Sequence, residues 1–221
     1  MKKTLAILSA LAAAAAIAGE VDSGNQLGFV PVTGEAGLKA ISVPVAGYSV
    51  DAAKPENIKI SEILQTAGLN KDDLLYTLGS NGQYNEYKLD ENGSWVASRV
   101  VTVDASGKIK ETSGTPAAEA TLTRGQAFWL NTQATQVNLM GQATTDQPAV
   151  TLSTGWNLIG SSSMTESMKV SSISGTVGDF LNVNGVQYQY TSSGWKNKKT
   201  KGAVTDSDVI PVGAGAMLRH Q

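Results

Sequence analysis

The sequence predicts an all-β fold made of two related small β units, each sandwich- or barrel-like, with one short helix. Three observations support this prediction. Glycine (23 of 221 residues) and small polar residues are frequent, which is typical of many short strands joined by tight turns. Most of the chain divides into two copies of one pattern. Only one short stretch has helical periodicity.

The duplication rests on landmarks that occur in the same order in both copies. The opening stretch Gly155-Trp-Asn-Leu-Ile-Gly-Ser161 aligns with Gly37-Leu-Lys-Ala-Ile-Ser-Val43, glycine on glycine. The closing residues 210–218 align with 122–130 without a gap. Between these ends lie three further matches: residues 179–183 with 73–77, Asn184-Gly185 with Asn81-Gly82, and Trp195 with Trp95. We therefore expect two units of one architecture.

The elements of the first copy follow from local periodicity. Residues 26–32 and 38–45 are expected to form strands, and Pro31 and Pro44 mark an edge or a strand end. A short helix is predicted where apolar residues recur at i, i+3, i+4 and i+7, namely Ile60, Ile63, Leu64 and Ala67. Further strands, separated by glycine-containing turns, are expected at residues 74–78, 84–89, 95–103 and 122–130.

The same reading divides the chain into four parts. Residues 1–18 are predicted to be a signal peptide, with Lys2-Lys3 before an apolar run and cleavage after Ala18. The β units are expected at residues 19–131 and 150–221, with a Gln- and Thr-rich connector at 132–149. An anchor helix needs about 18 to 20 strongly apolar residues. The apolar run after Lys3 is shorter than that and consists mostly of alanine. We therefore expect an exported bacterial protein (periplasmic, cell-surface or extracellular) with no transmembrane anchor in its mature chain.

Composition excludes several classes of function. The formal net charge is −2, which provides no basic footprint for nucleic acid. The absence of cysteine excludes disulfides, thiol chemistry and a lipid attachment site. With one histidine and no cysteine, a transition-metal cluster is not expected. We expect no metal and no cofactor.

Catalysis is not expected either. The only histidine, His220, is the penultimate residue, where chains usually fray, so a serine nucleophile would lack a base. Ser161-Ser-Ser163 is better explained as a polar strand end. The acidic pairs Asp72-Asp73 and Asp206-x-Asp208 are expected to be turn and cap residues. The sequence therefore predicts a protein that is not an enzyme.

Two turns have the oxygen ligands that calcium prefers, at residues 90–93 and 104–107. Neither continues into a calcium-binding loop, so both are expected to be ordinary hairpin turns. Gly213-Ala-Gly215 lacks the third glycine and the helix of a phosphate-binding loop. We expect it to be a closely packed strand.

The aromatic residues are the strongest indication of a binding site. Trp129 and Trp156 are expected to fill the cores of the two units, because small domains need large side chains there. Trp95 and Trp195 each follow a glycine-containing turn, and both core and exposed positions remain open for them. If exposed, they would form tentative glycan-stacking sites, since a flat ring with a polar tip stacks on a sugar face. The lysines at 196, 198, 199 and 201 are expected to be a solvated loop or a contact with an acidic polymer.

Gly155-Trp-Asn-Leu-Ile-Gly160 and Gly125-Gln-Ala-Phe-Trp-Leu130 resemble the opening and closing motifs of a repeat. This repeat occurs in exported β-repeat proteins, including uncharacterised surface proteins of the Verrucomicrobia and Lentisphaerae type. The first copy departs from it with Leu38 at the opening tryptophan, and the second with Ala216-Met217 at the closing aromatic pair. The resemblance implies export and β structure and carries no activity.

Two functions are therefore expected. The first is an exported, non-enzymatic structural or interaction protein at the cell surface, whose partner is itself or a cell-surface polymer. The alternative is a carbohydrate-binding module that uses exposed aromatic residues.

Overall fold

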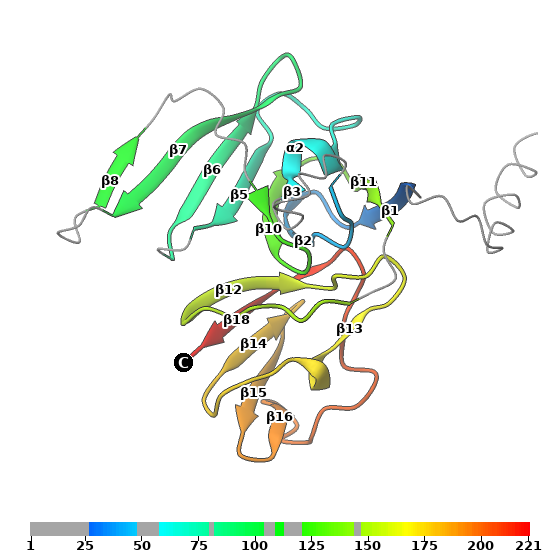
Figure 1. Ribbon diagram of the computed structural model, residues 1–221, viewed down its shortest axis with the longest axis vertical. Coiled ribbons are helices and arrows are strands. Elements are labelled where there is room, and N and C mark those ends of the chain that lie inside the picture. Colours follow the sequence, from blue (N-terminus) through cyan, green and yellow to red (C-terminus); the bar gives the residue numbers. More distant parts are fainter. Residues whose placement is uncertain (1–26, 48–57, 80–81, 104–108, 113–120, 144–146) are drawn as a thin grey trace, which may run out of the picture.

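The chain folds into two β units that follow one another along the sequence (Figure 1). This computed structural model describes residues 27–47, 58–79, 82–103, 109–112, 121–143 and 147–221. Antiparallel strands dominate both units, and α2 is the one α-helix among the described residues, so the predicted fold class is confirmed. No helix of these residues is long and apolar enough to cross a membrane. The predicted signal peptide and the turn at 104–107 lie outside the described residues.

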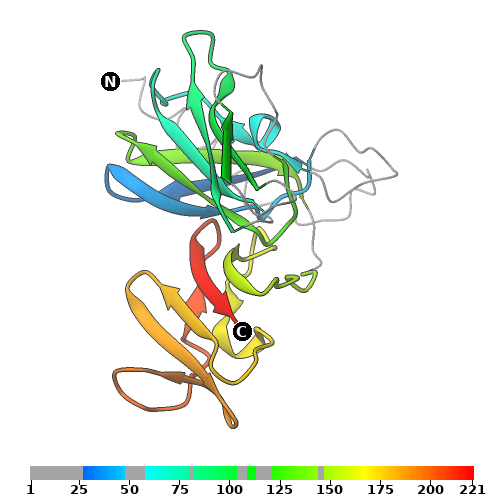
Figure 2. The ribbon, with the colours of Figure 1, turned by 90° about the vertical axis from the view of Figure 1, so that its left-hand side faces the viewer.

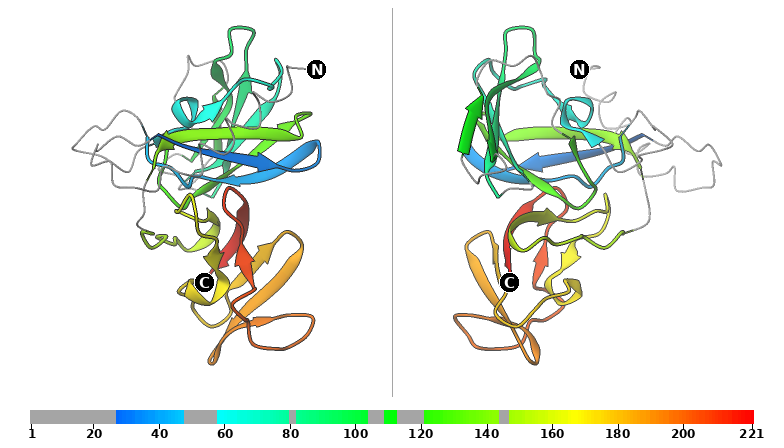
Figure 3. Two further views of the ribbon diagram at one scale, coloured as in Figure 1. Left: turned by 90° about the vertical axis from the view of Figure 1, so that its right-hand side faces the viewer. Right: turned by 60° about the vertical axis from the view of Figure 1, so that its left-hand side comes forward.

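The first unit is built on a six-stranded antiparallel sheet. Its strand order is β2 (Gly37–Ser42), β10 (Ala127–Thr132), β5 (Leu74–Leu78), β6 (Tyr84–Leu89), β7 (Trp95–Val103) and β8 (Ile109–Thr112). A three-stranded sheet is formed by β1 (Leu27–Thr33), β11 (Gln136–Gln142) and β4 (Leu64–Gln65). A two-stranded ribbon pairs β3 (Ile58–Lys59) with β9 (Thr121–Leu122). Figure 3 shows β1 and β11 side by side, close to the second unit.

One core lies between these sheets. In β10, Phe128 and Leu130 are fully buried, whereas Trp129 between them is half-buried on the opposite face. Successive side chains of a strand alternate between the two faces of its sheet, so this pattern assigns one face of the six-stranded sheet to the core. Val30 of β1 and Leu139 of β11 complete the core from the three-stranded sheet.

The helix is shorter than the sequence predicts. It spans Ile60–Ile63, and both of these residues are buried. Leu64 leaves helical geometry with φ −82° and ψ 108° and begins β4, where it pairs with Leu139. The apolar spacing is consistent with a longer helix, but sheet pairing satisfies the backbone of Leu64 and Gln65 instead.

The segment 132–149, expected to be a connector, contains a strand of the first unit. Residues 136–142 form β11, which pairs with all seven residues of β1. Val137 and Leu139 alternate inward and are buried, a period-2 signal weakened in the sequence by its Gln- and Thr-rich surroundings.

The second unit repeats the central sheet of the first. Figure 2 shows the two units one above the other. Its strand order is β12 (Gly155–Gly160), β18 (Gly215–His220), β14 (Phe180–Val183), β15 (Val186–Thr191) and β16 (Gly194–Asn197). This order matches β2-β10-β5-β6-β7. The ribbon of β13 (Met168–Lys169) and β17 (Val209–Ile210) matches β3 and β9, and the 3-10 turn Val170–Ser172 takes the place of α2.

Each unit buries one aspartate at the start of its third sheet strand. Asp73 Oδ2 accepts the Asn70 N–H (2.9 Å), and Asp179 Oδ2 accepts the Thr176 N–H (2.8 Å). The residue before each aspartate has positive φ: Asp72 (76°) in the first unit and Gly178 (104°) in the second. The same local turn therefore enters the matching strand in both units.

The two units dock through equivalent surfaces. The Ser42 N–H donates to Gly213 O (3.0 Å), and the Gly160 N–H donates to Gly125 O (2.8 Å). Because Ser42 aligns with Gly160 and Gly125 with Gly213, these two bonds are copies of each other. The units are thus related by an approximate two-fold axis, as in an isologous dimer interface.

Small residues allow this close approach. A Cβ on Gly160 would lie 2.2 Å from Ser42 Cβ, and a Cβ on Gly215 would lie 2.8 Å from Ala127 Cβ. Ser42 aligns with Gly160 and Ala127 with Gly215, so each contact joins matching positions across the axis. These residues lie on the faces of the central sheets that point away from the cores. One part of each outer face is therefore covered by the other unit.

Candidate functional site

The two tryptophans expected as tentative glycan-stacking residues are buried. Trp95 is 8% exposed and Trp195 is 3% exposed. Trp195 donates its indole N–H to Ile173 O (2.8 Å) and packs edge-on against Tyr190, with ring centroids 5.2 Å apart. Trp95 is the first residue of β7 and Trp195 the second of β16, and both face the core, so the turn before each strand does not lead to exposure. Neither offers a ring face to a sugar.

The two tryptophans expected in the cores lie on the outer faces instead. Trp156 is 43% exposed at the start of β12, next to Gly155, whose φ is +97°. Trp129 is half-buried because it alternates with the buried Phe128 and Leu130. The core expectation is therefore wrong for both residues, and their aromatic surface faces outward.

Trp129 belongs to a cluster on the outer face of the six-stranded sheet. We call this cluster the aromatic surface; it consists of Leu38, Tyr76, Tyr84, Trp129 and Asn131, which line an open hollow of about 460 Å³. In the sheet register, Trp129 lies opposite Tyr76, and Asn131 lies opposite Leu38. Neighbouring strands thus bring aromatic side chains together from β10, β5 and β6.

Hydrogen bonds within the aromatic surface orient its polar groups. The Trp129 indole N–H donates to Tyr84 Oη over 3.4 Å. Partial burial raises the pKa of Tyr76. The negative charge of neighbouring Glu86 and the hydrogen bond between the two side chains raise this pKa further. The Glu86 carboxylate also accepts a 2.6 Å hydrogen bond from the Ser98 hydroxyl. The surface therefore combines flat apolar rings with two tyrosine hydroxyls and the Asn131 amide.

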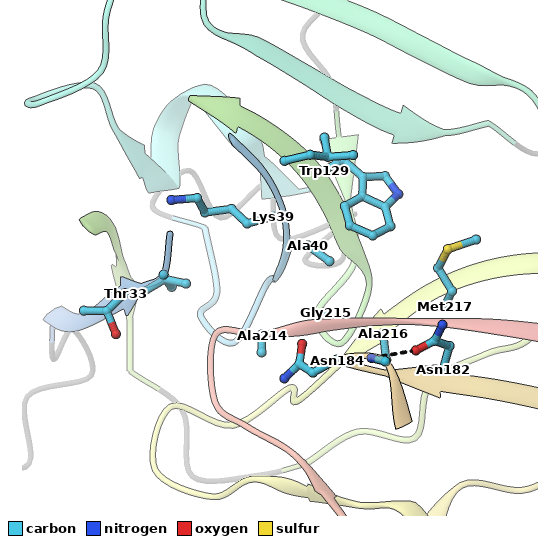
Figure 4. A pocket seen from close by; sticks show the side chains of 14 residues that line it. Thr33, Lys39, Ala40, Trp129, Asn182, Asn184, Ala214, Gly215, Ala216 and Met217 are labelled. Carbon is cyan, nitrogen blue, oxygen red and sulfur yellow. Dashed lines mark hydrogen bonds between the residues drawn. The ribbon is translucent and has the colours of Figure 1, made fainter. Parts of the chain in front are cut away.

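The aromatic surface continues into a cleft between the two units (Figure 4). The cleft has a volume of about 400 Å³ and shares Leu38 and Trp129 with the aromatic surface. The second unit contributes Asn182, Asn184 and Met217 to its lining. Asn182 Oδ1 accepts the Gly185 N–H (2.9 Å), which fixes the amide and leaves its NH2 group as a donor. The wall from the first unit thus carries the Trp129 ring beside Leu38 and Lys39, and the wall from the second unit carries two amides.

The approximate two-fold axis creates a second cleft with a different lining. It measures about 190 Å³ and lies between Trp156 and Leu158 of β12 and the residues Leu78 and Gly79 of the first unit. At the positions that match Trp129 and Tyr76 of the first unit, the second unit has Met217 and Asn182. Since both units build the same sheet, the fold itself does not require the aromatic surface.

His220 does not fray but takes part in β18, where it pairs with Gly155. Its Nδ1 lies 2.8 Å from Oδ2 of Asp179, which is fully buried and also accepts the Gln221 N–H at Oδ1 (2.9 Å). In the first unit, the Thr132 hydroxyl donates to Asp73 Oδ2 (2.6 Å) from the matching position. The histidine–aspartate pair therefore holds the closing strand to the turn before β14, as threonine does in the first unit.

The remaining polar groups considered from the sequence also have structural partners. The Ser161 hydroxyl donates to backbone carbonyls, and Ser163 Oγ accepts the Thr165 and Glu166 N–H groups. Asp72 forms an ion pair with Lys88 (2.8 Å), and Asp208 accepts the Tyr188 hydroxyl (2.8 Å). Within the described residues, no three His, Cys, Asp or Glu side chains are placed to hold a metal ion.

The sequence reading missed Leu38, Tyr76 and Tyr84 as site residues. The signal that could have found them is alternation along each strand, since Tyr76 lies between Leu75 and Thr77, both buried.

Comparison with protein-family models, curated proteins and solved structures found no match for this chain.

Proposed function

We propose that this is an exported, non-enzymatic interaction protein of the cell surface whose aromatic surface binds a neutral polysaccharide. The observation that carries the proposal is the grouping of Trp129, Tyr76 and Tyr84 on one open face. Their rings provide the apolar platform on which pyranose faces stack, and their hydroxyls bond to sugar hydroxyls. The inter-unit cleft extends this platform with amide donors.

Binding rather than catalysis is supported by how the titratable groups are used. Asp73 and Asp179 hold strands in matching ways in the two units, and Glu86, opposite Tyr76 in the sheet, accepts the Ser98 hydroxyl. The exported location comes from the signal peptide expected at residues 1–18 and is part of this proposal.

The test is isothermal titration calorimetry with hexasaccharides of β-glucan, xylan, mannan and chitin. We expect at least one to bind, and Trp129→Ala to weaken it by about 2 kcal/mol, the contribution of one buried aromatic face. That loss is about 30-fold in Kd. Tyr84→Ala, at a side chain 37% exposed, should also weaken binding. Val186→Ala is the control for an exposed apolar residue elsewhere. Failure of all four sugars to bind, or equal binding by Trp129→Ala, would contradict the proposal.

A second function, self-association, is favoured by β1. This strand is an edge of the three-stranded sheet among the described residues, and it exposes Leu27 and Phe29 (56% exposed). An exposed apolar edge strand is a template for pairing with another chain. In sedimentation velocity of residues 19–221, we expect concentration-dependent assembly that Phe29→Glu abolishes. A wild-type monomer at every concentration would refute self-association and leave the glycan proposal standing.

A further inference from the structure

The outer face of the second unit carries a different set of side chains from that of the first. A single row crosses all five strands of its sheet, because each residue lies directly opposite the next: Trp156, Arg219, Phe180, Gln189 and Lys196. We call this set the cationic row. Residues opposite one another share a face, and four strand spacings give the row a length of about 19 Å.

The cationic row is accessible and positively charged. Trp156, Arg219 and Gln189 are exposed, and Phe180 and Lys196 are half-buried. Lys198 Nζ lies 5.2 Å from the Phe180 ring centroid, which adds a third cation to the row. Among the described residues, neither Arg219 nor Lys196 lies within ion-pair distance of a carboxylate.

The first unit provides an internal comparison. Its matching row is Leu38, Asn131, Leu74, Lys88 and Val96. There the one cation, Lys88, is neutralised by Asp72 at 2.8 Å. The residue that matches Asp72 in the second unit is Gly178, which cannot supply a carboxylate. The same fold therefore forms without Arg219 and Lys196, whose matching residues in the first unit are Asn131 and Val96.

We propose that the cationic row is a second binding site, and that it takes an acidic polysaccharide built of uronic acids. The Arg219 guanidinium matches a carboxylate in a two-pronged geometry. Trp156, on one side of Arg219, presents apolar surface to a sugar ring, and on the other side Lys198 lies over the Phe180 ring and adds positive charge. Arg219 and Lys196 are three strand spacings apart, so the site suits an extended chain with separated charges.

Charge favours this occupant over nucleic acid. Duplex DNA presents a negative charge about every 1.7 Å and is bound mainly by proteins with a strong excess of lysine and arginine. This chain has a net charge of −2, so only a local row is positive. The site shares no residue with the aromatic surface, and the proposal therefore stands independently of neutral-glycan binding.

The test is calorimetric titration of the protein with hexagalacturonate. We expect binding that Arg219→Gln and Trp156→Ala each weaken at least tenfold, and that Trp129→Ala leaves unchanged. Lys199→Gln removes an exposed lysine outside the row and should also leave the affinity unchanged. Because all four positions are at least partly exposed, each variant should fold, and circular dichroism checks this. If one of the variants does not fold, Lys196→Gln takes its place.

Three results would overturn the proposal. One is no binding of hexagalacturonate by the wild type. Another is equal weakening by Arg219→Gln and Lys199→Gln, which would indicate general charge attraction. The third is equal or tighter binding of dextran sulfate, which contains no uronic acid, or of duplex DNA or phosphatidylglycerol vesicles. Loss of neutral-glycan binding alone, through Trp129→Ala, bears on the aromatic surface and not on this site.

Discussion

At the scale of single residues, the buried aspartates explain how each unit closes. Asp179 is fully buried, yet the Thr176 and Gln221 N–H groups and His220 surround its carboxylate with donors. Burial raises the pKa of Asp179, but these hydrogen bonds and the charge of His220 outweigh burial and lower it below 3.8. The ionised form is therefore the one that the fold stabilises.

This shift predicts a pH dependence of stability. Because the folded-state pKa lies below the unfolded value, the stabilisation is fully present above about pH 4 and is lost as pH falls through the lower, folded-state pKa. Asp179→Asn should cost about 1 to 3 kcal/mol at pH 7, because buried donors lose their charged acceptor. It should also flatten the decline in urea midpoint between pH 5 and pH 2. The exposed Asp206→Asn is the control, and an equally steep decline in Asp179→Asn would refute the assignment.

The tryptophans show what sequence reasoning achieves at this scale. That Trp95 and Trp195 occupy matching positions in two β units was predictable from the repeat. Their faces were not assigned correctly, because proximity to a glycine turn does not determine which side of a sheet a residue faces. Alternation does, and it places Trp129 outward between Phe128 and Leu130. Trp156 faces outward although its motif is apolar, and it shares that face with its exposed cross-strand neighbour Arg219.

At the scale of elements, the strands predicted at 74–78, 84–89 and 95–103 coincide with β5, β6 and β7, whereas the strand predicted at 122–130 is divided by a turn into β9 and β10. The order of these strands in the sheet and the pairing of β1 with β11 were not predictable, since both depend on contacts distant in sequence. The helix was overestimated for the same reason: Leu64 pairs with Leu139, a residue 75 positions away. Local periodicity in the sequence carries no information about so distant a pairing partner.

Gly160 provides an element-scale prediction about the docking of β12 on β2. An alanine Cβ would lie 2.2 Å from Ser42 Cβ and 2.6 Å from Ala214 O, so the strands must separate. Gly160→Ala should therefore destabilise the protein by about 1 to 3 kcal/mol in thermal unfolding. Gly34→Ala, where nothing lies within 4 Å, is the matched control. Adding Ser42→Gly should recover part of the loss; no difference between Gly160→Ala and Gly34→Ala would disprove the close contact.

At the scale of the whole molecule, the approximate two-fold axis allows one fold to present two unlike surfaces. The interface covers matching parts of both outer faces, and beyond it the units differ. The first carries rings and hydroxyls, and the second carries cations between aromatic residues. A sequence pattern shared by the two copies reveals their common fold, whereas the two surfaces that we propose to bind glycans lie where the copies differ.

The measurement that tests the central claim most directly is an NMR titration that follows the indole N–H signals of the four tryptophans. Single Trp→Phe variants assign the signals. On addition of a neutral oligosaccharide that binds, the Trp129 signal should shift in a saturable way, while those of the buried Trp95 and Trp195 should stay in place. A binding sugar that leaves the Trp129 signal unmoved, or that shifts Trp95 or Trp195 instead, would contradict the aromatic surface as the site.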